Sequence, residues 1–560
     1  MATDEAQISN HRFIPLSSSK ARDWIKALPL TDPGETTRRI FHGLVDLNRR
    51  ALPAMARLQI SEMLRPALDV SLEALQRHLE ARAFPLPSKS QKIFELTQSL
   101  MLEFAGAYQV AALDMMTKKE GNKKALQLAI YRAMDLMGKV LVLTYSVYVR
   151  TRETLWHDIH HLYLLAVENG VEKLPLRDAA VGAPTIEARY TQMNLLALVK
   201  PYSLRQGEVV RLMQYFAQHS PLVTLTRDTN GQQMGDYVHA ALLNSDEPAV
   251  MMLASDLPHS PTVRVLNLSA LVAQMDTHIR ELEAKGVPAM ILQEGLSRNL
   301  AKRVIYHLTA VLNRSYNRFL KNEQIGMVTR LPDVLSVIRQ AHKSEASEDA
   351  EAEDMLFNVF MASDYEDEHE DEGEARKAVI HRVAEEDGAR IQTWHVMNTS
   401  VGGYGLRWEG KEASGARVGE IVALRDLNDD TSLWMIGVIK WMEFVAGKGL
   451  CCGVELLSTK MMEVSVQQVL NRTVAQKMPM EGLMLPSIEG VRPDPALILP
   501  AYIFQAGDEI RLEFAEREER VRLVLLDECL GAFAYFRFTT LAEKAIEEDE
   551  DDFTLLWQSL

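Results

Sequence analysis

Apolar residues recur at intervals of three and four along most of the N-terminal part of the chain. This spacing places them on one face of a helix, as in the stretch from Ile60 to Leu75. The pattern is typical of both an α-helical bundle and an irregular solenoid, and the sequence does not separate the two. Residues 222–242 and 249–268 follow no single period, so the sequence does not decide whether they contain short strands. The predicted helices cover residues 36–170 with breaks, 185–220, 266–286, 296–320 and 331–342.

The C-terminal part carries a different pattern, in which apolar and polar residues alternate over short stretches. Residues 394–406 read as a strand, a tight polar turn and a second strand. Glu509–Phe514 alternates strictly, and two similar stretches follow at 521–526 and 533–538. Many short strands favour barrels, because closure of a sheet removes its exposed edges. The fold class is therefore multidomain α+β, with an N-terminal helical region and a C-terminal antiparallel β-barrel. The last strands form either a second small β module or an extension of that barrel.

Shifts in composition predict the domain boundaries. We expect a loosely ordered N-terminus, a helical domain, an acidic linker, a β-barrel, the second β module or barrel extension, and an acidic tail. In that order the segments are 1–30, 31–343, 344–374, 375–475, 476–541 and 542–560. At 560 residues the chain is too long for one ordinary hydrophobic core, which agrees with several domains.

The net charge of −16 is concentrated in two segments. Residues 344–375 hold fourteen Asp and Glu without a Lys or Arg, and residues 547–552 hold six more. Without those twenty carboxylates, 57 of the 77 acidic residues remain against 61 basic ones, so the predicted folded parts carry about +4. Acidic runs of this kind are usually solvated. The net charge of the predicted folded domains is therefore not one that would repel an anionic ligand.

Several functional classes are disfavoured by simple features. Cys451, Cys452 and Cys529 do not form a disulfide framework, which favours a reduced, cytoplasmic setting. The polar, acidic first residues do not resemble a signal peptide, and the longest apolar run, near 138–149, is too short to span a membrane. No motif of a nucleophilic, phosphate-transferring or redox enzyme is found, so we expect no catalysis, no cofactor, and no binding of DNA or RNA.

The turn between residues 394 and 406 carries the most specific pattern in the chain. It contains Asn398, Ser400 and Gly403 in the spacing Asn-x-Ser-x-x-Gly. Residues two apart in an extended segment project from the same face, and glycine permits unusual backbone conformations or close approach. Arg376 and Arg382 lie upstream. Because a guanidinium matches both phosphate oxygens and the edge of guanine, this combination indicates a site for a guanine nucleotide.

This motif resembles the signature of PilZ domains, which are receptors for cyclic di-GMP. Three later stretches resemble the strands that follow the motif in that family, at 416–424, 436–441 and 453–457. The resemblance covers residues 375–475 and implies a barrel with a ligand site at Arg376, Arg382, Asn398, Ser400 and Gly403. The sequence departs from the family where Arg-x-x-x-Arg is expected, because five residues separate its two arginines.

Other residues near the motif have alternative interpretations. Arg390 and Arg407 could assist an anion, although exposed surface arginines are the commoner outcome. Trp394 and Trp408 could stack on a base or fill the barrel core. In the helical region, His157 and His161 have the spacing of a metal-binding pair, but no third ligand is evident, so we expect no metal.

The resemblance thus implies a non-catalytic, cytoplasmic bacterial effector that binds cyclic di-GMP. It would relay binding through the helical domain to an unidentified protein partner, in motility, surface attachment or biofilm control, with pilus and flagellar partners both open. The alternative is an interaction scaffold whose barrel no longer binds nucleotide. An apolar segment inside the linker, residues 355–361, would either dock on a neighbouring protein or pack on the helical domain of its own chain.

Overall fold

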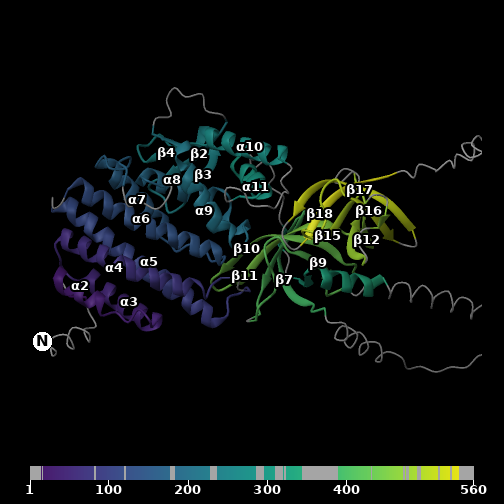
Figure 1. Ribbon diagram of the computed structural model, residues 1–560, viewed down its shortest axis with the longest axis horizontal. Helices are drawn as coiled ribbons and strands as arrows, with labels where there is room; N and C mark the ends of the chain where they lie inside the picture. Colours follow the sequence, from purple (N-terminus) through teal and green to yellow (C-terminus); the bar gives the residue numbers. More distant parts are fainter. Residues whose placement is uncertain are drawn as a thin grey trace, which may run out of the picture. The chain divides into compact units, whose positions relative to one another are not determined.

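The structure is a computed structural model of the whole chain. Figure 1 shows its helices and strands. Arg376, Arg382, the linker 344–374 with its apolar segment 355–361, and the acidic tail from 542 lie outside the described residues. The described residues are 14–15, 17–80, 83–118, 122–176, 183–227, 236–285, 296–309, 319–320, 323–342, 389–400, 402–410, 412–429, 432–470, 473–474, 478–487, 494–514, 517–529 and 533–541.

Long helices make up most of the N-terminal part, as the three-and-four spacing predicts. The helix α6 is apolar on nearly every side, because it contacts α4, α5, α7, α8 and α9. Figure 1 shows α4, α5 and α6 side by side. The helices are α2 (Ser18–Lys26), α3 (Pro33–Arg49), α4 (Ala54–Gln76), α5 (Ser88–Thr117), α6 (Lys123–Ser146), α7 (Leu155–Glu168), α8 (Ile186–Leu198), α9 (Glu208–His219), α10 (Ser269–Ala284) and α11 (Arg298–Thr309).

Local sequence signals explain where several helices begin. The side chains of Asp32, Asn122 and Thr185 accept hydrogen bonds from backbone N–H groups in the first turns of α3, α6 and α8. Our expectation that residues 1–30 are loosely ordered does not hold for α2. Ala21 and Trp24 of this helix are buried in the helical core, and this burial holds the segment in place.

A small antiparallel sheet interrupts the helical region at the stretches whose period was ambiguous. Its order is β1-β4-β2-β3, so the last strand in sequence lies between the first two. The strands are β1 (Thr224–Thr226), β2 (Tyr237–Leu242), β3 (Val250–Leu253) and β4 (Val263–Asn267). Short 3-10 turns accompany this part at Pro201–Ser203, Ser220–Leu222 and Ala254–Asp256.

The first barrel is a sheet of order β5-β7-β6-β9-β10-β11-β8, closed by pairing of β7 with β8. Two of its strands, β5 and β6, precede the acidic linker, whereas we expected the barrel to begin at 375. The helix expected at 296–320 correspondingly ends at Thr309. The strands are β5 (Phe319–Leu320), β6 (Gln324–Thr329), β7 (Gln392–Ser400), β8 (Gly403–Trp408), β9 (Ile421–Asp426), β10 (Met435–Val445) and β11 (Gly449–Ser458).

The remaining strands form a second closed barrel, which decides between the two alternatives left open by the sequence. Its order is β13-β12-β14-β15-β18-β17-β16, and β12 pairs with β16 to close it. Because β12 belongs here, the second barrel begins before the expected boundary at 475. The predicted fold class is thus confirmed. The strands are β12 (Met462–Leu470), β13 (Thr473–Val474), β14 (Met480–Leu485), β15 (Ala496–Pro500), β16 (Glu509–Phe514), β17 (Arg517–Cys529) and β18 (Phe533–Thr540).

A helix at residues 331–342, predicted from the sequence, packs against strands of both barrels. Its apolar side chains, among them Val334 and Ile338, share one buried core with Ile421 and Ile436 of the first barrel and with Ile498 of the second. This shared core joins those strands, because separating them would expose apolar surface on both sides.

The chain divides into two compact units, and the first barrel contributes strands to both. One unit contains residues to Glu323 with Trp394–Val418 and Ile439–Glu455, and the other contains the rest of the chain. The first unit therefore groups the hairpin Ile439–Glu455, which contains the end of β10 and most of β11, with the helices. Among the described helices, none combines the length and apolar character needed to cross a lipid bilayer.

Candidate functional site

The predicted turn joins β7 to β8 at one end of the first barrel. Asn398 lies opposite Gly405 and Ser400 lies opposite Gly403, so the hairpin has two residues between its paired ends. The register shifts between Val396 and Asn398, which leaves one residue of β7 unpaired. Such a bulge redirects the side chains that follow it.

The bulge turns the polar side chains of β7 to the outside of the barrel. Trp394 and Val396 before it are buried, whereas Asn398 and Ser400 after it are partly exposed. On β8 the side chain of Leu406 is buried. Asn398 and Ser400, two residues apart, therefore share the outer face with the two glycines of β8 opposite them. This is the arrangement that the spacing of the motif predicted.

Gly403 is required by the packing of the barrel itself. A Cβ at this position would overlap the carbonyl oxygen of Val454 in β11 and would lie 3.2 Å from the Cα of Glu455. The glycine therefore permits β8 and β11 to approach each other. Of the two roles that the sequence left open, the structure shows the unusual backbone conformation, with φ at +156°, and the close approach that it shows is to the protein's own backbone.

Gly405 and Gly453 lie opposite each other on β8 and β11 and form a floor without side chains. The Asn398 amide covers one end, because a Cβ on Gly405 would lie 2.8 Å from its Oδ1. The Trp441 indole of β10 covers the other, because a Cβ on Gly453 would lie 2.6 Å from its Cδ1. Both glycines are buried beneath these two side chains, so the outer surface here is made of an amide and an indole, which suit a planar, hydrogen-bonding group.

Trp441 is the residue that sequence reasoning missed at this surface. It was recognised as part of a predicted strand, but not as a neighbour of the motif. Its indole is partly exposed, and the adjacent Lys440 forms a 2.9 Å ion pair with Glu455 of β11. The only signal in the sequence was the glycine at 453, which leaves room for a large side chain on the neighbouring strand.

The same β10–β11 hairpin contacts the helical region. The backbone N–H of Phe444 donates to the carbonyl of Tyr148 at 2.6 Å, and Val149 forms an isolated bridge with Phe444. Arg150 Nε donates to Glu443 Oε1 at 2.9 Å. Trp441 and these contacts are thus two or three residues apart on one strand.

A second contact joins the helical region to the segment after β8. Both the N–H and the hydroxyl of Ser414 donate to the carbonyl of Phe84 at 2.8 Å. The ring of Phe84 packs edge-on against Tyr148, with 4.9 Å between centroids. Ser414 is completely buried, so these hydrogen bonds are shielded from water.

The other residues considered from the sequence have structural roles. Trp394 and Trp408 are buried with ring centroids 5.4 Å apart, so they form core rather than a stacking surface for a ligand. Arg407 forms an ion pair with Glu409, and Arg390 is exposed.

The histidines of α7 were considered as metal ligands because of their spacing. The rings of His157 and His161 are stacked with 6.4 Å between centroids. Within the described ranges, no group of three His, Cys, Asp or Glu residues is placed to hold a metal ion. His160, on the same helix, is buried and bonded through both ring nitrogens, to Tyr190 and to the carbonyl of Glu247. Burial lowers the pKa of His160.

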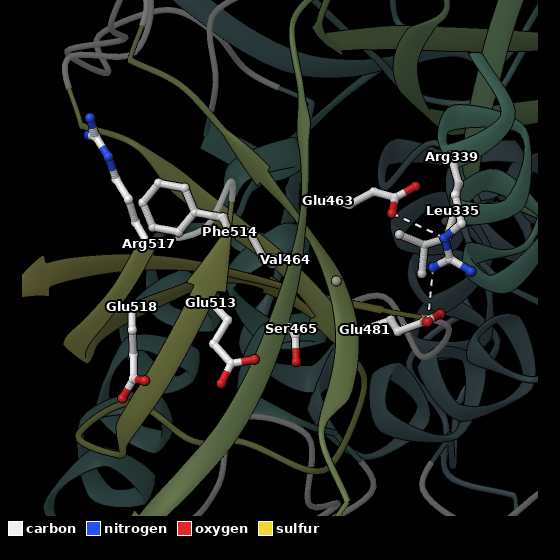
Figure 2. Close-up of a pocket in the computed structure, with 11 residues that line it drawn as sticks. Leu335, Arg339, Glu463, Val464, Ser465, Glu481, Glu513, Phe514, Arg517 and Glu518 are labelled. Carbon is white, nitrogen blue, oxygen red and sulfur yellow. Dashed lines mark hydrogen bonds and ion pairs between the residues drawn. The ribbon is translucent and has the colours of Figure 1, made fainter. Parts of the chain in front are cut away.

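A cavity of about 540 Å³ lies on the second barrel beside the 331–342 helix (Figure 2). Arg339 donates to Glu463 at 3.1 Å and to Glu481 at 2.9 Å, as the dashed lines show. Glu513 and Glu518 also line the cavity. Four carboxylates outnumber the two arginines of the lining, Arg339 and Arg517, and Arg339 is already paired, so the cavity would repel an anionic nucleotide. This cavity is therefore a poor candidate for the nucleotide site.

Family models describe almost the entire chain. The model "Cyclic-di-GMP receptor FimW, N-terminal domain" matches residues 19–229, and "Cyclic-di-GMP receptor FimW, middle PilZ domain" matches 238–462. The model "FimW C-terminal beta-barrel domain" matches 464–541. The predicted resemblance to PilZ domains is confirmed, and the middle model includes β5 and β6 before the linker.

A curated protein is similar over the full length. It is the cyclic-di-GMP receptor FimW of Pseudomonas aeruginosa, with 25% identity over 600 residues, covering 98% of this chain and 97% of the relative. Its name describes a receptor, which is a binding protein rather than an enzyme. No solved structure gives a significant match.

Proposed function

Because the chain belongs to the FimW family of PilZ-domain proteins, we propose that it is a non-catalytic receptor for cyclic di-GMP. The observation that carries this proposal is the outer surface at the β7–β8 turn. Asn398 and Ser400 are partly exposed there beside the glycine floor, on the strands that carry the family motif. The alternative is a scaffold without nucleotide binding, and it would remain if the titration described below detected no binding.

In this proposal each residue has a distinct role. Asn398 and Ser400 supply short donors and acceptors for a guanine edge and a phosphate. The partly exposed indole of Trp441 offers a face on which a base can stack. Arg376 and Arg382 clamp the phosphates through charge-assisted hydrogen bonds. Gly403 contributes by holding β8 against β11, which fixes the glycine floor on which the Asn398 and Trp441 side chains lie.

We further propose that the β10–β11 hairpin relays binding to the helical region. A ligand that stacks on Trp441 alters the packing of β10, and the same strand is bonded to the helical region through Glu443 and Phe444. A shift of this strand would change the contacts at Tyr148 and Arg150. The helical region then presents the signal to a protein partner in motility, surface attachment or biofilm control. Free thiols at Cys451 and Cys452 support a cytoplasmic location.

Calorimetric titration with cyclic di-GMP tests the ligand. We expect binding by the full chain, loss of at least about 100-fold in the Arg376→Ala/Arg382→Ala double variant, and about 10-fold loss in Ser400→Ala or Trp441→Ala. Arg517→Ala is the matched control, because it removes an exposed arginine from the second barrel. Absence of heat and of any thermal shift with folded protein would refute the receptor and leave the scaffold.

Hydrogen exchange with and without cyclic di-GMP tests the relay. We expect altered exchange in peptides covering 439–450 and 144–150, in addition to the turn itself. Glu443→Ala should retain nucleotide binding but reduce the effect at 144–150, because it removes one of the bonds between hairpin and helices. A change confined to the turn and the preceding arginines would show that binding is local.

A further inference from the structure

The helical region contains a groove unconnected with the nucleotide surface. It has a volume of about 770 Å³ and lies between α4, α6 and α9, with α8 contributing to its lining. Val70 and Leu72 of α4, Val142 of α6, and Val210 and Met213 of α9 provide apolar side chains. Polar side chains, among them Gln192, Gln214 and Gln218, line the rest of the groove, so the helical core reaches the surface here as part of a mixed apolar and polar lining.

Two valines of the groove are unusually accessible for their type. Val70 is 48% exposed and Val210 is 43% exposed, on two different helices, whereas Leu72 and Met213 are 4% and 7% exposed. Single exposed apolar residues are ordinary, but a group that lines one depression is typical of a binding surface. A ligand here would cover the two valines and contact the buried pair beneath them.

The dimensions of the groove match a short stretch of helix. Its walls run from Asp69 to Gln76 on α4 and from Val210 to Gln218 on α9. At a rise of roughly 1.5 Å per residue, each wall is about 10–12 Å long, or two helical turns. An amphipathic helix fits such a groove with apolar side chains at positions i, i+3 or i+4, and i+7.

The lining of the groove carries three carboxylates and two cations, so its net charge is −1. Arg189 forms a 2.8 Å ion pair with Asp135, and Lys139 lies 3.5 Å from both Asp69 and Asp135. The cations of the groove are therefore neutralised by its own carboxylates. Glu73 is exposed on the rim and has no ion pair among the described residues. Glu73 is thus available to a positive charge on a bound helix.

We propose that this groove binds an amphipathic helix of another protein, with lysine or arginine beside its apolar face. The proposal builds on the proposed role of the helical region in contacting a partner, but it does not depend on nucleotide binding. The acidic runs at 344–375 and 547–552 of the chain itself are less suitable occupants, because their carboxylates would be brought toward Glu73.

A pair of peptides with the full chain tests the groove. The first probe is a fluorescein-labelled, 18-residue helical peptide with leucines at i, i+3 and i+7 flanked by lysines. The second is identical except that glutamates replace the lysines. We expect fluorescence anisotropy to show about 10-fold tighter binding of the lysine peptide, because the rim attracts one charge and repels the other.

Variants of the chain then locate the binding. Glu73→Lys should reduce or reverse the preference between the peptides, since it exchanges the sign of the rim charge. Val210→Asp should weaken the lysine peptide at least about 10-fold, because it places a charge on the apolar wall. Val524→Asp is the matched control, since Val524 is 53% exposed on β17 of the second barrel. It should leave peptide binding unchanged.

Three results would overturn the proposal. The first is equal affinity for both peptides, and the second is equal binding by wild type and Val210→Asp. The third is a wild-type dimer in light scattering that Val210→Asp converts to monomer, because a second copy would then occupy the groove. Val210→Asp should also bind cyclic di-GMP like the wild type, so a failure of the groove is distinguishable from a failure of the receptor.

Discussion

Gly403→Ala tests whether the glycine of the turn serves the barrel rather than the ligand directly. The new Cβ would overlap the carbonyl oxygen of Val454 and lie 3.0 Å from its carbonyl carbon. The atoms in the way belong to the backbone of β11, so they cannot move aside as a flexible side chain can. β8 and β11 must separate locally, which disturbs the Gly403–Glu455 pair and the floor beside it.

The expected cost has two parts. Overpacking a close contact costs about 1–3 kcal/mol. Weakening one hydrogen bond of the β8–β11 ladder adds about 1 kcal/mol. Gly403→Ala should therefore lower the free energy of unfolding of the barrel by about 2–4 kcal/mol. Gly402→Ala is a matched control in the same turn, because a Cβ at Gly402 meets no atom within 4 Å. Both variants remove one glycine from the unfolded chain, so that contribution cancels in the comparison.

The assay is a urea titration read by hydrogen exchange in peptides covering 403–408. This readout isolates the barrel from the helical region and the second barrel, whose transitions would otherwise overlap with it. Gly402→Ala should change stability by less than about 1 kcal/mol. Equal stability of the two variants would refute the reasoning. If Gly403→Ala also weakens nucleotide binding, we attribute the loss to distortion of the glycine floor, because alanine removes no atom that could contact the ligand.

Three further predictions concern other parts of the molecule. Burial and neighbouring cations lower the pKa of His307 to about 4. The unfolded chain therefore binds a proton between roughly pH 6.5 and 4 that the folded chain does not, so stability should fall as the pH drops through this window. His307→Gln should flatten that part of the profile in thermal melts, and an unchanged slope would contradict the assignment. Arg339→Ala leaves two glutamates unpaired and should destabilise the second barrel by about 1–2 kcal/mol in urea, and no change would show that the pairs are too exposed to matter. A double-mutant cycle on Arg150 and Glu443 should give a coupling of at most about 1 kcal/mol, since Arg150 is 68% exposed. A larger value would make this pair a main link between hairpin and helices.

The helices and the strands of the hairpin motif could be predicted from the sequence because their signals are local. A helix repeats its apolar face within a few residues, as between Ile60 and Leu75 in α4. The Asn398–Gly403 turn also lies within one short stretch, and its two polar side chains are on the outer face as expected. The absence of a disulfide framework and the acidic runs could likewise be predicted from the sequence.

Strand partners across the linker could not be predicted in the same way. β6 lies before the acidic linker and pairs with β9 after it, from Ile325–Asp426 to Thr329–Val422. No local period indicates which distant strand will supply these hydrogen bonds. For the same reason the boundary between the barrels was placed too late, because β12 has the alternation of a strand whichever barrel contains it.

The sequence by itself determined the kinds of element and the chemistry of the turn, because both depend on residues that are near one another in the chain. Only the tertiary structure placed Trp441 beside Gly453, and only it showed that Gly403 faces the backbone of β11. It also brought Phe444 to Tyr148 and opened the groove between α4, α6 and α9. These features depend on contacts between segments far apart in the sequence, and such contacts follow from the packing of the whole chain.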